Sequence, residues 1–114
     1  MSDIPLWTAA VTARDGTHVV TLTGEIDLAA ADQLLDLLRA EIDTPASVVV
    51  IADLTGVTFL DSAGLGAFVG AYNHAGLAGR RFQLVNPGRP VKRILEISGV
   101  YDVFVPSQAG DDDR

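Results

Sequence analysis

The stretch FLDSAGLGAF, residues 59–68, sets a serine directly after an aspartate and two glycines within an otherwise apolar segment. Leu65 and Phe68 begin a helical spacing of apolar residues, so Asp61 and Ser62 are predicted at a junction between a strand and a helix. A serine at such a junction can be a nucleophile, can cap the free N–H groups of the helix, or can accept a phosphate. Each role makes a different demand on the rest of the chain.

A nucleophilic serine is not supported by its surroundings. A strand-to-helix nucleophile needs Gly-x-Ser-x-Gly, but Leu60 stands at the first glycine position. A triad also needs a histidine, and the chain has only His18, in a predicted hairpin, and His74. His74 is about three helical turns from Ser62, or ~18 Å along a helix axis. We expect both histidines at the surface and interpret the chain as a protein without enzyme activity.

The glycines near Ser62 do not form a nucleotide site. Gly64, Gly66 and Gly70 follow a predicted strand, but a dinucleotide fold wants an acid at the end of the next strand, where this chain has VNP, residues 85–87. No P-loop lysine follows the glycines either. We interpret them as small residues that let a helix approach the sheet or a partner closely. No cofactor and no metal are expected on this chain.

Capping and charge switching remain open for Ser62. Either Ser62 or Asp61 is placed to cap the first N–H groups of the helix, typically for ~1 kcal/mol. The same N–H groups would also accept a phosphate on Ser62, which would add roughly −1.5 to −2 charges beside Asp61. A partner surface fitted to the neutral serine would then meet extra volume and repulsion. Phosphorylation would therefore end binding and leave the fold intact.

The elements around this junction are predicted from apolar periodicity and turn residues. Asp15-Gly16 marks the turn of an N-terminal hairpin, Asp27 is the expected N-cap of the first helix, and Asp53 is expected to end a strand in a solvated turn. That strand should be buried between helices on both faces, because its run lacks alternation. The predicted elements are a hairpin over 7–22, a helix that follows Asp27 and ends before Pro45, a strand over 48–52, a helix from 62 to the 76–79 region, a strand over 82–86, a helix from Pro90 to Gly99 and a short strand over 103–105.

This order, β-β-α-β-α-β-α-β, predicts an α/β fold with a mostly parallel or mixed sheet. The length of 114 residues fits one domain, over 1–105, with a polar acidic tail over 106–114. The start of the chain lacks the basic region of a signal peptide, and no apolar stretch approaches ~20 residues, so we expect a cytoplasmic protein without a membrane span.

Charge argues against direct binding to nucleic acid. The formal net charge is −7, and the chain has no cysteine for a disulfide or a thiolate metal site. Five of the eight basic residues nevertheless lie within 14 positions: Arg80, Arg81, Arg89, Lys92 and Arg93. Such a cluster is either a solvated helix face and loop or a surface for a charged partner.

Three stretches together resemble the STAS domain of anti-sigma factor antagonists: LTGEIDLAAADQL (22–34), VVVIADLTGVTFLDSAGLGAFVGAY (48–72) and NPGRPVKRILEISGV (86–100). The resemblance covers nearly the whole chain. It implies a curved mixed sheet flanked by helices. It also implies that Ser62, the serine after the aspartate, is phosphorylated by a partner kinase.

The resemblance further implies partner switching. The unphosphorylated form would bind an anti-sigma factor that is also a serine kinase and so release the sigma factor. Phosphorylation of Ser62 would end this binding, and a serine phosphatase would restore it. ATP and magnesium would belong to the kinase. The partner surface implied for this chain consists of Asp27, Asp61, Ser62, Ala63, Gly64 and Gly66.

This chain departs from the family at two places. Many relatives have a second hydroxyl where Ala63 stands. The usual C-terminal amphipathic helix is expected to be reduced or absent, because the end of the chain is short and polar. Two other readings stay open. One is a receiver domain phosphorylated on Asp53, although the required acidic pair and lysine are missing. The other is a STAS-type sensor, scaffold or subunit of a transport or stress-signalling complex, because a fold does not fix a function.

Overall fold

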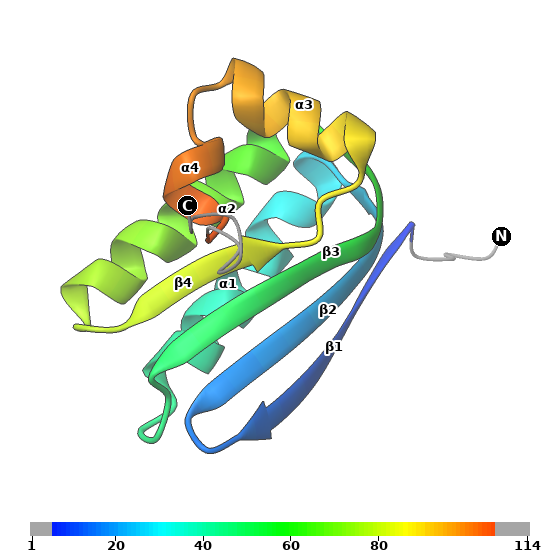
Figure 1. Cartoon of the computed structure of the whole chain (residues 1–114). Helices are drawn as coiled ribbons and strands as arrows, with labels where there is room; N and C mark the ends of the chain where they lie inside the picture. The colour runs from blue at the N-terminus through cyan, green and yellow to red at the C-terminus, as the bar shows by residue number, and fades with distance from the viewer. Residues whose placement is uncertain (1–5, 107–114) are drawn as a thin grey trace, which may run out of the picture.

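The structure is a computed structural model, and it describes residues 6–106 (Figure 1). The predicted tail therefore lies, apart from Pro106, outside the described residues. Four strands form one sheet in the order β1-β2-β3-β4, and helices join them. The elements are β1 (Trp7–Arg14), β2 (Thr17–Ile26), α1 (Leu28–Asp43), β3 (Val49–Leu60), α2 (Ser62–Leu77), β4 (Arg81–Val85), α3 (Arg89–Ile97) and α4 (Tyr101–Phe104).

The sheet is mixed, as predicted. Asp15 and Gly16 both have positive φ, 50° and 85°, which is the backbone of a two-residue type I′ turn, so β1 and β2 pair antiparallel. β2 pairs parallel with β3, and β3 with β4. Because these three strands run in one direction, α1, α2 and α3, which follow them, all begin toward the end of the sheet where the strands finish. We call this the carboxyl end and the opposite one the amino end.

β3 is longer than the sequence predicts, and Asp53 lies in its middle rather than at its end. Two register shifts against the second half of β2 explain the error. Each is a β-bulge that adds one residue to β3, which breaks the alternation of buried and exposed positions and bends the strand. The fully or nearly buried side chains beyond the first residue of β3 accordingly fall at Val50, Ala52, Leu54, Val57 and Leu60.

α1 and α2 lie side by side on one face of the sheet (Figure 1). Gly70 of α2 faces Leu35 of α1 so closely that a Cβ atom at this glycine would lie 3.1 Å from Leu35 Cδ1. The interpretation of the glycines as residues for close approach is confirmed for Gly70. α1 contributes a fully buried stripe spaced by four residues, Ala30, Leu34, Leu38 and Ile42.

The prediction of helices on both faces is wrong. Val19 and Ile51 point to the other face and are only half-buried, and no helix in the described part of the chain covers β1, β2 and β3 there (Figure 1). β-branched residues favour a strand whether or not helices cover both of its faces. The lack of polar residues in this run therefore did not show that both faces are buried.

The last predicted strand, over 103–105, is also wrong, because this segment belongs to the helical turn α4 and the residue after it. The ring of Phe104 packs edge-on against Tyr72 of α2 and Phe82 of β4, with centroid distances of 5.5 and 6.1 Å. A short apolar run does not separate strand from helix by periodicity, and this packing decides it. Within the described residues the C-terminal helix is thus reduced to one turn.

α3 ends as predicted. Gly99 has a φ of +75° and donates its N–H to the carbonyl of Glu96, and Val100 donates to Leu95. These two bonds are a Schellman motif, with glycine at the left-handed position. Pro90 lies in the first turn of α3, after the N-cap Gly88.

Candidate functional site

Asp61 joins the first turns of two helices at the carboxyl end of the sheet. It is the N-cap of α2, where its Oδ1 accepts a hydrogen bond from the backbone N–H of Gly64 at 2.9 Å. Its Oδ2 accepts a second bond from the backbone N–H of Leu28, the first residue of α1, at 3.2 Å. One carboxylate therefore satisfies free N–H groups of both helices and holds their starts together.

Ser62 is the first residue of α2 and is exposed. Its side chain makes no hydrogen bond to any residue within 6–106. The choice that the sequence left open is thus partly resolved: the cap is Asp61, and the fold does not use the Ser62 hydroxyl. That hydroxyl lies at the positive end of the helix dipole, where a negative group is favourable.

Asp27 occupies the predicted N-cap position of α1. Its Oδ1 accepts hydrogen bonds from the backbone N–H groups of Ala29 and Ala30 at 3.0 and 3.2 Å. Asp27 and Asp61 thus both bond to the first turn of α1, and Ser62 follows Asp61 directly. The structure brings these three predicted residues together at one end of the sheet.

The two predicted glycines of α2 have different surroundings. A Cβ atom at Gly64 would lie 2.1 Å from the carbonyl oxygen of Ile26, so only glycine lets α2 start against the end of β2. A Cβ atom at Gly66 would meet nothing within 4 Å, and Gly66 is exposed. Gly64 is therefore needed by the fold, whereas Gly66 leaves open surface beside the half-buried Ala63.

Two exposed apolar residues, one bonded through its backbone to Asp61 and one three positions before Ser62, were missed by the sequence reasoning. Leu28 is 76% exposed although its backbone N–H bonds to Asp61, and Phe59, near the end of β3, is 47% exposed. Leu28 continues the apolar spacing of α1, so periodicity alone predicts a buried side chain, yet this side chain is exposed. Both side chains are therefore accessible to a partner.

Asp53 lies away from this site, and its carboxylate is engaged in hydrogen bonds with nearby residues. Its Oδ1 accepts hydrogen bonds from the backbone N–H and the hydroxyl of Thr55, at 3.0 and 2.7 Å, and from the Asn86 amide at 3.3 Å. Burial raises the pKa of Asp53, but the bonds from Thr55 and Asn86 together lower it below the usual value. These bonds give Asp53 a structural role.

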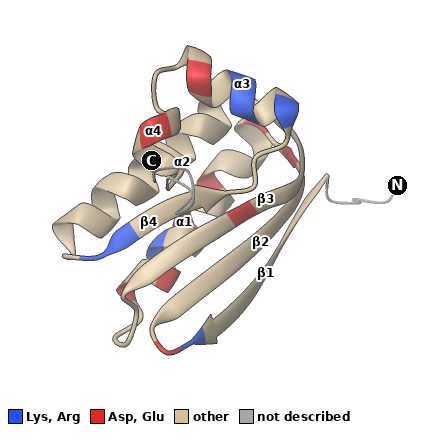
Figure 2. Ribbon diagram, in the orientation of Figure 1, with Lys and Arg blue, Asp and Glu red and all other residues tan. Residues whose placement is uncertain are grey.

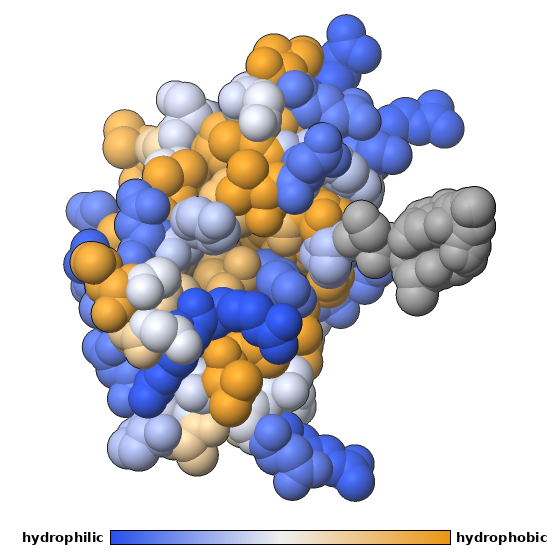
Figure 3. Space-filling view, turned by 60° about the vertical axis from the view of Figure 1, so that its left-hand side comes forward, coloured by the Kyte–Doolittle hydropathy of each residue, from blue (hydrophilic) through white to orange (hydrophobic). Residues whose placement is uncertain are grey.

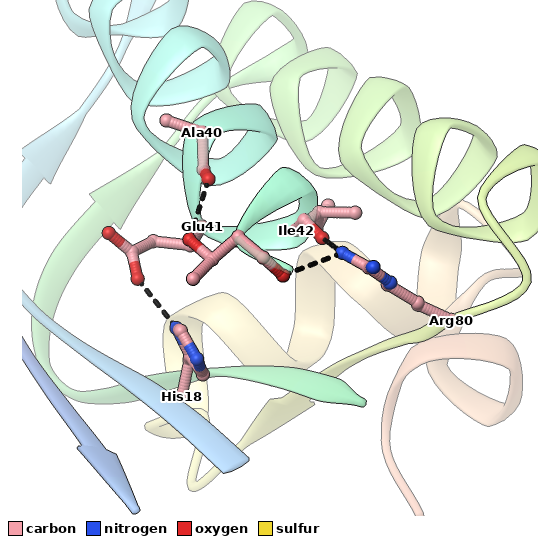
Figure 4. Close-up of polar contacts among 6 residues, drawn as sticks. His18, Ala40, Glu41, Ile42 and Arg80 are labelled. Carbon is pink, nitrogen blue, oxygen red and sulfur yellow. Dashed lines mark hydrogen bonds and ion pairs between the residues drawn. The ribbon is translucent and has the colours of Figure 1, made fainter. Parts of the chain in front are cut away.

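Neither histidine reaches Ser62. His74 pairs with Asp43, at 2.8 Å from Nε2 to Oδ1, near the opposite end of α2. The expectation that both histidines are at the surface is wrong for His18, which is 6% exposed and pairs with Glu41 at 2.7 Å (Figure 4). His18 lies in the predicted hairpin, and nothing in the sequence indicated that α1 would cover this position. Both rings are engaged at the amino end of the sheet.

Metal-binding clusters and membrane-spanning helices are both absent from residues 6–106. No group of three or more His, Cys, Asp or Glu side chains in this range is arranged to hold a metal ion. In the same range, none of the helices combines the length and the apolar character that crossing a membrane requires.

Comparison with known proteins identifies the family. Residues 8–111 match the STAS domain, so the chain belongs to the STAS domain family. The anti-sigma-B factor antagonist of Listeria monocytogenes is 35% identical over 94 residues, which cover 80% of each chain. The resemblance noted in the sequence is thereby confirmed.

Solved structures agree with the fold. An anti-sigma factor antagonist from Mycobacterium paratuberculosis superposes with a TM-score of 0.77 at 28% identity, covering 92% of this chain and 89% of that one. The anti-sigma factor antagonist SpoIIAA in its unphosphorylated form gives a TM-score of 0.75 at 23% identity, covering 91% of both chains. The second likeness speaks for the fold alone.

Proposed function

We propose that this chain is an anti-sigma factor antagonist controlled by phosphorylation of Ser62. In its unphosphorylated form it binds an anti-sigma factor that is also a serine kinase, which releases the sigma factor. The kinase transfers the γ-phosphoryl group of ATP to the Ser62 oxygen, and ADP and the hydroxyl proton leave. A serine phosphatase hydrolyses the phosphate ester and restores binding. ATP and magnesium are held by the kinase, and the chain itself works without a cofactor.

The observation that carries this proposal is the division of work between Asp61 and Ser62. Asp61 caps α2, and the exposed Ser62 hydroxyl has no hydrogen-bond partner within residues 6–106. A kinase can therefore phosphorylate this hydroxyl without breaking a contact of the fold. Support also comes from the Listeria relative, which is named an anti-sigma-B factor antagonist.

Charge explains why a phosphate would end binding. Asp27 and Asp61 already place two carboxylates beside Ser62, and a phosphate adds roughly −1.5 to −2 charges to them. A partner surface that desolvates the serine would have to accommodate this charge and volume, and unpaired buried charge is costly. The proposed partner surface is Asp27, Asp61, Ser62, Ala63 and Gly66, with the exposed side chains of Leu28 and Phe59. Gly64, which the sequence also assigned to this surface, is buried and supports the start of α2 from beneath.

The fold should tolerate the modification. A phosphate at the first helical position lies near N–H groups that no carbonyl of α2 accepts, and near the positive end of the dipole. Modification should therefore change affinity for the partner and leave the unfolding free energy nearly unchanged.

The test is incubation with an anti-sigma factor kinase, ATP and magnesium, followed by intact mass and peptide mapping. We expect one phosphate on Ser62, none in Ser62→Ala, and normal modification of Thr58→Ala. Thr58 is the matched control, because it is an exposed hydroxyl near the end of β3. Phosphate on Thr58 or Ser47 with Ser62 unmodified would overturn the proposal.

A further inference from the structure

α3 has three exposed basic residues, Arg89, Lys92 and Arg93. The whole chain has a net charge of −7, with 15 acidic residues against eight Lys and Arg. Nevertheless, none of these three side chains forms an ion pair with an acidic residue within 6–106, where the ion pairs involve Arg14, His18 and His74. An acidic protein thus presents a concentrated and locally unneutralised basic surface.

Packing of α3 keeps these charges outward. Val91 and Leu95 are buried and Ile94 is half-buried against the core, so Lys92 and Arg93 face solvent. Lys92 Nζ lies 5.4 Å from the centre of the Tyr101 ring, a cation–π contact that holds the ammonium on the surface. An open depression of about 430 Å³ runs over this face and is lined by Arg89, Pro90, Lys92, Arg93 and Glu96.

The basic face of α3 lies toward the same end of the molecule as Ser62. β4 stops opposite Asp53, and α3 packs against β3, whose last residue leads into Asp61 and Ser62. Figure 2 shows basic residues over the first turns of α3 and an acid near its end. Figure 3 shows hydrophilic side chains projecting at this top end of the molecule. A partner that reaches Ser62 therefore approaches the molecule from the end at which α3 is exposed.

We propose that this basic face, Arg89, Lys92 and Arg93, is a second contact for the anti-sigma factor kinase and binds an acidic segment on the kinase surface. The inference rests on the proposed function. Charge complementarity fixes the chemistry of the partner: the three cations lie in a depression without carboxylates of their own apart from Glu96. Carboxylate groups of the partner would supply the missing counter-charges.

This second contact differs from the Ser62 surface in its response to phosphorylation. A phosphate on Ser62 repels the partner at the switch but does not alter the charge of α3. Attraction through α3 steers the partner toward the site in both states and weakens as salt screens it. The phosphorylated chain should therefore keep a weak, salt-sensitive affinity for the kinase.

The test is binding of the kinase by the full chain carrying Arg89→Glu and Arg93→Glu. Its matched control carries Arg14→Glu and Arg81→Glu, two exposed arginines that lie in one row across the amino end of the sheet. Both variants change the net charge equally. Arg89→Glu also places an acid in the first turn of α3, where the dipole favours it, so the fold should persist, which circular dichroism checks.

We expect affinity to fall by about tenfold or more in the α3 variant and to change by less than about twofold in the control, with weaker salt dependence in the α3 variant. Equal loss in both variants would mean that net charge alone matters, and no loss in either would remove α3 from the interface; both results overturn the inference. Asp111→Asn, Asp112→Asn and Asp113→Asn together should leave affinity unchanged. Tighter binding of that variant would assign the basic face to the acidic tail of the chain instead.

Failure of the proposed function would look different. If the kinase binds but Ser62 is not phosphorylated, the switch is wrong, and the comparison of the two double variants still decides the role of α3. If the wild-type chain binds no anti-sigma factor kinase, both the switch and the α3 contact are overturned.

Discussion

The two ends of the sheet differ in whether their polar side chains are paired within the chain. At the amino end, His18 pairs with Glu41, and the Arg80 guanidinium donates to the carbonyl of Ile42 in the last turn of α1 (Figure 4). The guanidinium also donates to the carbonyls of Thr44 and Pro45, which follow α1. At the carboxyl end, Asp27 and Asp61 satisfy the helix starts, while the Ser62 hydroxyl has no hydrogen-bond partner and the α3 cations have no ion-pair partner among residues 6–106.

This difference separates stability from recognition. Groups that this chain satisfies internally hold the amino end together, and their loss should appear in the free energy of unfolding. Exposed groups at the carboxyl end contribute little to folding and are available to another protein. Beneath them, however, the start of α2 still depends on close backbone packing.

The largest effect on stability is expected from Gly64→Ala. The new Cβ atom would lie 2.1 Å from the Ile26 carbonyl oxygen and 2.8 Å from Leu60 Cδ1, so the start of α2 must move, at about 3 kcal/mol. Urea unfolding measures this change. Gly66→Ala is the matched control and should stabilise the helix by about 0.5–1 kcal/mol, since its Cβ meets nothing within 4 Å. Similar stabilities for the two variants would break the distinction between packed and open glycines.

Arg80→Met should cost about 2 kcal/mol of unfolding free energy, because three carbonyls lose a charged donor. Arg81→Met, at an exposed neighbouring position, should change stability by less than about 0.5 kcal/mol. Thermal melts compare the two. Phosphorylation of Ser62 should proceed normally in both, and a slowed reaction in Arg80→Met at temperatures where it is folded would argue against the separation of the two ends.

A smaller, pH-dependent effect is expected from Asp53→Asn. Because the folded-state pKa of Asp53 is lowered, the ionised carboxylate stabilises the fold above its unfolded value, about 3.9, and this contribution is lost as pH falls through the folded pKa. The variant should be less stable than wild type by under about 1 kcal/mol at pH 7. Urea midpoints should converge below about pH 4. A difference between the two urea midpoints that widens in acid would show that the pKa of Asp53 is not lowered by folding.

Much of the fold could be predicted because its local signals are strong. Asp15-Gly16, Asp27 and Gly99 each occupy the backbone position that their chemistry favours, so the hairpin, the start of α1 and the end of α3 were found. The predictions were wrong where tertiary contacts decide the structure. The bulges of β3 break its alternation, so its second half was not predicted as strand. The segment over 103–105 was predicted as a strand, but the packing of Phe104 on Phe82 favours the helical turn α4.

The candidate site was predictable in its residues but not in its geometry. The sequence placed Asp61 and Ser62 at a helix start, but could not say which one caps, since both can. That Asp61 also bonds to Leu28 depends on two helices that begin 34 positions apart in the chain meeting at one end of the sheet. The exposure of Leu28 and Phe59 has no signal in periodicity either.

The most direct test of the account is calorimetric titration of the anti-sigma factor kinase with the unmodified chain and with the chain phosphorylated on Ser62. The unmodified chain should bind. The phosphorylated chain should bind at least about a hundredfold more weakly, since like-charge contact across an interface costs several kcal/mol. Ser62→Ala should bind like the unmodified chain. Equal affinities of the phosphorylated and unmodified chains would contradict the claim that Ser62 is the switch.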